Sequence, residues 1–300
     1  MRLLFVVNPI SGDIDKEPFL KEATALLDVY DIHYHIFRTT GKDDLENLKK
    51  EIDHYQPSRV ASVGGDGTTL FTSTALLDSE IPMGIIPLGS ANGMAVELFV
   101  DPDPMSALKD ILMSKISVGL DLLKVNNEHY CLHIGDIGVN AQIVNGYSKD
   151  PNRGMTTYFK YFLEQLRETN IFDYTIEIDG EEYDETGIMM AICNARKFGT
   201  GVPLNSISNP FDGKFELVAI PEMNFEDLII VGLSKFDESF LEDANGNVYS
   251  AEKAKIKFKN PQLLQLDGEV IGDITELDIE IVPGAVQFIT TRKNLLLEDL

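Results

Sequence analysis

The chain has 300 residues, 44% of them hydrophobic and 25% charged, which is enough to form one large core or two of ordinary size. Its formal net charge of −24 repels nucleic acid and anionic membrane surfaces, so we expect no nucleic-acid partner. No apolar run is long enough to span a membrane, and the start is too short for a signal peptide, which predicts a cytoplasmic protein.

Strands and helices alternate in the first part of the chain. The hydrophobic pattern predicts strands over 2–8, 32–37, 59–63 and 83–89, and helices over 17–29, 43–55, 68–77, 91–99 and 104–114. This alternation predicts a mostly parallel sheet with helices on both faces. Ligands of such folds bind beyond the carboxyl ends of the strands, where NPISG, GGDGT and PLGSAN all fall.

After about residue 118 the pattern changes to alternating strands separated by Asp-Gly and Asn-Gly turns. This pattern predicts an antiparallel β domain, a sandwich, interrupted by one aromatic helix over 155–170. That helix is interpreted as part of the core, with an acyl-chain pocket as the alternative. We therefore expect an α/β domain over 1–118, a β-rich domain over 119–285, and a tail over 286–300 that packs on the first domain. Cys131 and Cys193 lie in apolar stretches, which predicts buried thiols.

The stretch Gly64-Gly65-Asp66-Gly67-Thr68 follows a predicted strand and opens a predicted helix. Glycines allow a backbone to approach a ligand closely, and a helix N-terminus offers unpaired N–H groups to a phosphate. An aspartate is suited to this place if Mg²⁺ lies between it and the phosphates. The stretch lacks the Gly-Lys-Ser/Thr of a Walker A loop and the third glycine of a dinucleotide fingerprint.

Several ordered segments resemble the diacylglycerol kinase catalytic domain family, which includes bacterial lipid kinases and sphingosine kinases. They are N-P-I-S-G at 8–12, G-G-D-G-T at 64–68, P-L-G-S-A-N at 87–92, G-V-N-A at 138–141, Asn194 with G-T-G at 199–201, D-G at 212–213 and L-D-G-E at 266–269. The resemblance covers nearly the whole chain and implies a first domain like that of NAD kinases and phosphofructokinases, followed by the β-sandwich.

The resemblance also implies roles for individual residues. ATP contacts would come from Asn8, Thr39 or Thr40, Gly64, Gly65, Asp66, Gly67, Thr68, Thr69, Ser90 and Asn92, and the spacing to Asp44 favours Thr39 over Thr40. Asp66 would act through Mg²⁺ in catalysis, and Asp121 would help to organise the metal network. A structural Mg²⁺ site would use Asp212 with the carbonyl groups of Asn209 and Lys214. Asp267 and Glu269 are the candidates for the general base on the acceptor hydroxyl.

Three features complicate the assignment. Gly93 stands where the family often has an aspartate, a variant similar to sphingosine kinases, and Asn140 replaces another usual aspartate. Asp179-Gly180-Glu181 is a second copy of D-G-E, and Asp-Gly is a standard hairpin turn, so either copy alone is better explained as a turn. Only the order of the family's segments favours the copy at Asp267, and the copy at Asp179 is interpreted as a hairpin tip.

Four lysines, at 253, 255, 257 and 259, share one face of a predicted strand. We interpret them as a solvated face, with a basic strip for lipid head groups as the alternative.

The sequence thus predicts an ATP- and Mg²⁺-dependent kinase that phosphorylates a hydroxyl of diacylglycerol or a related lipid and contacts membranes transiently. The alternatives are a sphingoid-base kinase, then a NAD kinase, then a non-catalytic nucleotide or lipid sensor. The resembled family includes dimers, so a homodimer is the alternative to a monomer.

Overall fold

The computed structural model describes residues 1–138, 141, 171–198, 203–222 and 246–299. The chain forms two compact units, the first made of Met1–Leu122 with Val282–Leu300 and the second of Leu123–Ile281. The first unit therefore includes the last segment of the chain as well as its beginning. Each unit is described by itself.

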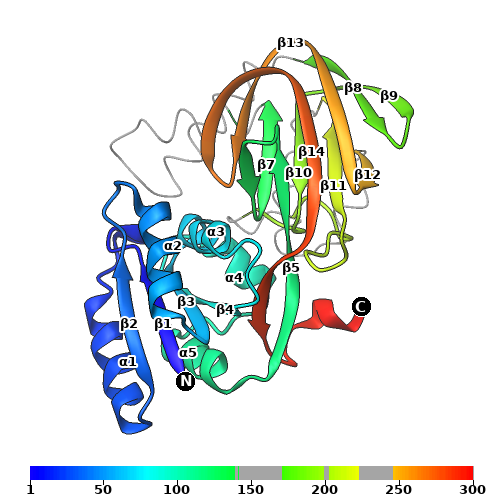
Figure 1. Ribbon diagram of the computed structural model, residues 1–300. Coiled ribbons are helices and arrows are strands. Elements are labelled where there is room, and N and C mark those ends of the chain that lie inside the picture. Colours follow the sequence, from blue (N-terminus) through cyan, green and yellow to red (C-terminus); the bar gives the residue numbers. More distant parts are fainter. Residues whose placement is uncertain (139–140, 142–170, 199–202, 223–245, 300) are drawn as a thin grey trace. The chain divides into compact units, whose positions relative to one another are not determined.

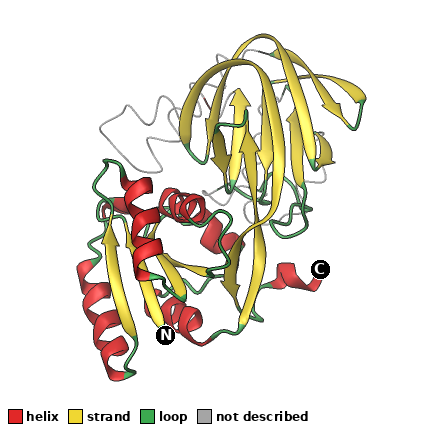
Figure 2. Ribbon diagram, viewed as in Figure 1, coloured by secondary structure: helices red, strands yellow, loops and turns green. Residues whose placement is uncertain are grey.

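The first unit is a parallel sheet with helices beside it (Figure 1, Figure 2). Its strands lie in the order β4-β3-β1-β2, and the end of β14 pairs with β4 through Phe288 and Met83. The strands are β1 Arg2–Val7, β2 His33–Arg38, β3 Arg59–Gly64 and β4 Met83–Pro87. The helices are α1 Glu17–Val29, α2 Asp44–Tyr55, α3 Asp66–Ala75, α4 Gly93–Glu97 and α5 Pro104–Met113, with short 3-10 turns η1 Ser11–Asp13 and η3 Leu295–Asp299.

The hydrophobic pattern explains why these elements form. Residues 3–7 of β1 are all buried, as expected of a central parallel strand covered on both faces. Helix α1 starts with a proline in its first turn and buries one stripe of Phe19, Leu20, Ala23 and Leu27 against the sheet. The predicted order of strands and helices is present, and the predicted α/β class of this part is confirmed.

The second unit consists almost entirely of antiparallel strands (Figure 2). Five of them follow the order β12-β11-β10-β7-β13, β14 pairs with β13, and the hairpin β8-β9 joins β13 through β8. Two strands, β5 Ile116–Val125 and β14 Glu269–Thr290, are shared with the first unit. The others are β6 His129–Cys131, β7 Ile134–Gly138, β8 Phe172–Ile178, β9 Glu181–Gly187, β10 Met189–Cys193, β11 Phe215–Ile220, β12 Asn247–Ala251 and β13 Lys253–Leu266. The chain passes between the units along β5 and β14.

Buried aliphatic and aromatic side chains from these strands form the core of the second unit. Both cysteines are buried and free, as predicted. Over the described ranges, no helix has the length and apolar character needed to cross a membrane.

Candidate active site

Three loops meet at the carboxyl edge of the parallel sheet in the first unit. They follow β1, β3 and β4 and contain the segments NPISG, GGDGT and PLGSAN. Strand β1 pairs with β2 on one side and β3 on the other, so successive connections run in opposite directions from it. Such a switch point opens a crevice between adjacent loops, which is where open α/β sheets bind ligands.

Three glycines allow these loops to touch backbone to backbone. A Cβ atom on Gly12 would lie 2.7 Å from the carbonyl carbon of Gly89, and one on Gly89 would lie 2.7 Å from the nitrogen of Gly65. A Cβ atom on Gly65 would lie 3.2 Å from Cα of Gly89. The Gly65 N–H also donates to the Ser11 hydroxyl at 3.0 Å. Gly12, Gly65 and Gly89 are thus required by the packing of the loops themselves.

Gly67 has no such requirement. It lies in the first turn of α3, has no left-handed backbone angle, and a Cβ atom there would meet nothing within 4 Å. Within the described chain, the backbone N–H groups of Asp66 and Gly67 have no hydrogen-bond partner. Open space beside unpaired N–H groups at a helix N-terminus suits a phosphate group.

Asp66 makes two hydrogen bonds that the sequence did not indicate. Its carboxylate accepts the N–H of Gly93 at 2.9 Å and of Met94 at 2.8 Å. Helix α4 begins after Asn92, which has a left-handed backbone and no capping bond from its own side chain. Asp66 therefore caps α4 and ties the glycine loop to the loop after β4.

Asn92 shapes the same loop. Its side-chain oxygen accepts the Gly89 N–H at 2.8 Å, and its amide nitrogen donates to the Gly89 carbonyl at 3.0 Å. Both ends of this amide are therefore engaged within the loop.

The two threonines after β2 differ in what their hydroxyls can do. The Thr40 hydroxyl donates to Asp44 at 2.9 Å, which occupies it at the start of α2. In the described part of the chain, the Thr39 hydroxyl, the Asn8 amide nitrogen and the Ser90 hydroxyl have no hydrogen-bond partner, so they are free to contact a ligand. This difference supports Thr39 over Thr40.

The hydroxyls of Thr68 and Thr69 face the loop backbone. Thr69 donates to the carbonyl of Gly65 at 3.2 Å. Thr68 is buried, and a Cβ atom on Gly64 would lie 2.7 Å from its Cβ, so Gly64 makes room for that side chain.

Asp121 is buried on β5 and accepts the N–H of Gly284 at 2.6 Å. Gly284 has a left-handed φ of 60°, and a Cβ atom on Gly119 would lie 2.7 Å from its Cα. Asp121 thus fixes a close approach of two strands. Among the described residues, no group of three or more His, Cys, Asp or Glu side chains is placed to hold a metal ion.

In the second unit, Asp267 is the candidate base whose carboxylate is held by several hydrogen bonds. Its carboxylate accepts backbone N–H groups of Leu132 at 2.7 Å, His133 at 2.9 Å and Ile134 at 3.1 Å, and the Cys131 thiol at 3.3 Å. Burial raises the pKa of the Asp267 carboxyl above its ordinary value, although these donors oppose the rise. Among the described residues, the Leu132 N–H is the one donor to Oδ2, which leaves Oδ2 able to accept a proton or a hydroxyl donor.

Side chains behind this turn hold it in place. Gln265 is buried, accepts the Gly268 N–H at 2.7 Å and donates to the buried carboxylate of Asp136. Asn194 donates to the carbonyl of Leu132 at 2.8 Å. Asp267 is therefore preorganised by Gln265 of β13 and by Asn194, which directly follows β10.

Both copies of D-G-E form the same hairpin turn. Asp267 and Gly268 have φ values of 48° and 86°, and Asp179 and Gly180 have 53° and 83°, as a type I′ turn requires. Asp179 is exposed, as the hairpin-tip interpretation predicts. Glu269 is also exposed, and it starts β14 beyond the turn.

Asn209, Asp212 and Lys214 lie in one turn before β11. The Asp212 N–H donates to the Asn209 carbonyl at 3.2 Å, and the Lys214 N–H donates to the Asp212 carboxylate at 2.9 Å. The structure brings these three residues together, and the buried Glu216 of β11 is near enough to interact electrostatically with Asp212.

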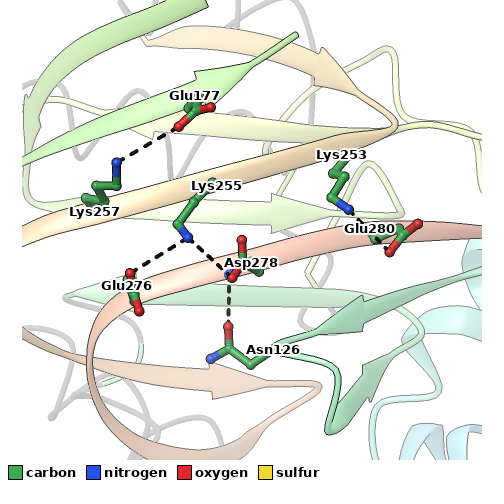
Figure 3. Close-up of polar contacts among 8 residues, drawn as sticks. All are labelled: Asn126, Glu177, Lys253, Lys255, Lys257, Glu276, Asp278 and Glu280. Atoms are coloured by element: carbon green, nitrogen blue, oxygen red, sulfur yellow. Dashed lines mark hydrogen bonds and ion pairs between the residues drawn. The ribbon is translucent and has the colours of Figure 1, made fainter. Parts of the chain in front are cut away.

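The four lysines of β13 share one face and are paired with acids of the neighbouring strands, and Figure 3 shows the pairs of Lys253, Lys255 and Lys257. They alternate with the buried Ala254, Ile256 and Phe258, as the solvated-face interpretation predicts. The pairs are Lys253–Glu280, Lys255–Glu276, Lys255–Asp278, Lys257–Glu177 and Lys259–Asp173, at 2.8 to 4.0 Å. The row is therefore charge-balanced and does not form an unpaired basic strip.

Three predictions lie outside the described residues: Asn140, the segment 199–201 and the helix over 155–170. Conversely, the bridging hydroxyl of Ser11 and the burial of the Lys16 amine were not predicted. The one signal for Lys16 was that Asp13 stands where the resembled family commonly has a lysine, which Lys16 could replace.

Comparisons with known proteins agree with this architecture. A model of the diacylglycerol kinase catalytic domain matches residues 2–125. A model of the YegS C-terminal NAD kinase beta sandwich-like domain matches residues 136–290. The predicted β-sandwich class of the second part is thereby confirmed.

Individual relatives are also named as kinases. A Staphylococcus carnosus protein named "Putative lipid kinase" is 30% identical over 76% of this chain and 75% of its own length. The fold is similar to that of a diacylglycerol kinase from Bacillus anthracis, with a TM-score of 0.72, 18% identity and 98% of each chain covered. It is also similar to an NAD kinase from Archaeoglobus fulgidus in complex with ATP, with a TM-score of 0.59, 15% identity and coverage of 100% and 97%. The chain belongs to the diacylglycerol kinase catalytic domain family and, by that membership, is a kinase.

Proposed function

We propose that this protein transfers the γ-phosphoryl group of ATP to a hydroxyl group of diacylglycerol or a related lipid. The observation that carries the nucleotide part is the open space at Gly67 beside the unpaired N–H groups of Asp66 and Gly67. Packing does not require a glycine there, whereas a bound triphosphate would. The family and the names of its relatives support the lipid acceptor of this proposal.

The loops of the first unit would bind and orient the nucleotide. The N–H groups that open α3 would donate to phosphate oxygens, and Asn8, Thr39 and Ser90 would contact the nucleotide with polar groups that are free to do so. Catalysis of this type depends mainly on positioning and on charge stabilisation.

Asp66 is the candidate Mg²⁺ ligand. A carboxylate has about four acceptor positions, and Asp66 uses two of them on α4, so it retains capacity for one cation whose other ligands are phosphate oxygens and water. Bound Mg²⁺ would neutralise charge on the phosphates. Asp121 would support this site from β5, and the turn of Asp212 with the Asn209 and Lys214 carbonyls stays a proposed second site.

Asp267 would act as the general base. As the acceptor oxygen bonds to phosphorus, the bond to ADP breaks, and Oδ2 of Asp267 would take the proton of the hydroxyl group. Asp267 is preferred over Glu269 because its carboxylate is held by four donors and its pKa is raised towards neutrality by burial.

The test is transfer of label from γ-labelled ATP with Mg²⁺ to diacylglycerol, sphingosine or NAD, each offered alone. We expect a labelled lipid, with diacylglycerol as the first acceptor and sphingosine as the alternative. Labelled NADP would contradict the proposal in favour of a NAD kinase. Nucleotide binding without transfer to any acceptor would indicate a sensor.

A further inference from the structure

Lys16 carries a buried positive charge just before α1. The residue is 3% exposed, and its Nζ donates to the backbone carbonyls of Ser11 and of Ile14, the latter at 2.7 Å. In the described part of the chain, no carboxylate lies within 4.0 Å of this Nζ. Asp13 and Asp15, which act on it electrostatically, are both exposed.

A buried charge without an ion-pair partner is unfavourable unless something compensates for it. Burial lowers the pKa of the Lys16 ammonium below its ordinary value, while Asp13 and Asp15 act in the opposite direction. An ammonium has three N–H donors, and two are engaged here. Among the described residues, the direct hydrogen-bond partners of this cation are two neutral carbonyls, and the nearest acids are exposed. We therefore infer that a bound anion completes the surroundings of the Lys16 ammonium.

A single residue, Ser11, connects the Lys16 ammonium with the loop of the candidate phosphate site. Lys16 holds the carbonyl of Ser11, and the hydroxyl of the same Ser11 accepts the Gly65 N–H at 3.0 Å. The adjoining Gly12 contacts the loop of Gly89 backbone to backbone. Hydrogen bonds through Ser11 thus connect the charge of Lys16 to the glycine loop, the loop whose N–H groups are proposed to bind a phosphate.

We propose that Lys16 is a positioning residue for nucleotide binding, which orients Gly65 through Ser11 and supplies a fixed positive charge to the triphosphate. The inference rests on the proposed function. It adds that the positive charge of Lys16 favours binding of the negatively charged triphosphate. Lys16 is not required to touch the reacting atoms.

The experiment measures ATP affinity by calorimetry for the wild type, Lys16→Met, Lys16→Arg and Lys21→Met. Methionine keeps the buried stem without the charge, and Lys21→Met removes an exposed lysine of the same helix. At pH 7.5 we expect the Kd for ATP to rise about tenfold in Lys16→Met, an effect equivalent to about 1.4 kcal/mol. We expect less than a threefold change in the Kd for ATP in Lys16→Arg and in Lys21→Met.

A pH series separates charge from structure. Because the pKa of Lys16 is lowered, wild-type affinity should weaken as pH rises towards 10, whereas Lys16→Arg should stay flat because arginine remains protonated. Equal ATP affinity in Lys16→Met and wild type, or the same alkaline loss in Lys16→Arg, would overturn the inference. A wild-type protein that does not bind ATP at any pH would instead overturn the proposed function.

Discussion

The Asp267 carboxylate accepts backbone N–H groups of the loop after β6 and is also the proposed general base. The pH dependence of the activity tests its role as a base. The base must be ionised to accept a proton, and burial raises its pKa above the ordinary 3.8 of an aspartate. Activity should therefore fall as pH decreases through this raised pKa, at a higher pH than an exposed aspartate would give. The measurement is kcat/KM for the lipid from pH 4 to 8; an acid limb at or below pH 4 would argue against Asp267 as the base.

Asp66 is expected to contribute to stability as well as to activity. Asp66→Ala removes two hydrogen bonds to the start of α4, and we expect the free energy of unfolding to fall by about 1–3 kcal/mol. Asp53→Ala, on the exposed face of α2, should change it by less than about 0.5 kcal/mol. Urea unfolding of both variants measures this, and equal stability would mean that the capping bonds do not matter.

Single residues were the hardest features to predict from sequence. The hydroxyl of Ser11 accepts a hydrogen bond from Gly65, which is 54 residues away in the chain, and no local sequence pattern predicts such a contact. The same Asp-Gly turn occurs at Asp179 and Asp267, and only the loop after β6 supplies the donors that make Asp267 different. Asp66 could be predicted as a ligand of the phosphate site, but its bonds to α4 depend on how two distant loops approach each other.

At the scale of elements, the junction of α3 with the glycine loop allows a test with two matched substitutions. Gly67→Ala places its Cβ in open space within a helix, so stability should rise by up to about 1 kcal/mol. The same methyl group would occupy the space proposed for a phosphate, so the Kd for ATP should increase at least tenfold. Unchanged ATP affinity in Gly67→Ala would remove the main support for a nucleotide at this helix.

Gly89→Ala is the opposite case. Its Cβ would collide with the backbone of Gly65, so the two loops must separate and both stability and ATP binding should decline. Thermal unfolding monitored by circular dichroism, together with calorimetry, distinguishes the two variants. A Gly89→Ala protein as stable as the wild type would show that the loops do not pack as described.

Strongly periodic elements were predictable, and short or irregular ones were not. Helix α1 has the predicted bounds because a proline and a clear apolar stripe define it. The alternating pattern after residue 118 does not single out strand β12, because it is a short strand with a mostly exposed surface, paired with β11 in the described part of the chain. Strand β5 was missed because it is buried along one stretch without alternation.

For the whole molecule, we expect the net charge of −24 to oppose binding to anionic membranes. The lysines of β13 do not offset it locally, because each is paired with an acid. Figure 3 shows the pairs of Lys253, Lys255 and Lys257. At low ionic strength, activity on anionic vesicles should be lower than on zwitterionic vesicles, and the gap should close near 0.15 M salt as the Debye length falls to about 8 Å. Higher activity on anionic vesicles at low salt would reveal a basic surface that this account lacks.

Fold class and family were predictable because they depend on patterns spread over the whole chain, such as strand–helix alternation and the order of NPISG, GGDGT, PLGSAN and LDGE. The acceptor was not predictable to the same degree. Recognition of a lipid depends on the shape of an apolar pocket, and residue patterns along one chain do not define that shape.

The most direct test of the account compares the two D-G-E turns in one assay. Wild type, Asp267→Asn and Asp179→Asn are incubated with γ-labelled ATP, Mg²⁺ and a total lipid extract, and the labelled product is identified by mass. We predict labelled lipid from the wild type and Asp179→Asn, and at least a hundredfold less from Asp267→Asn with ATP affinity unchanged. Wild-type activity in Asp267→Asn, or equal losses in both variants, would contradict the account.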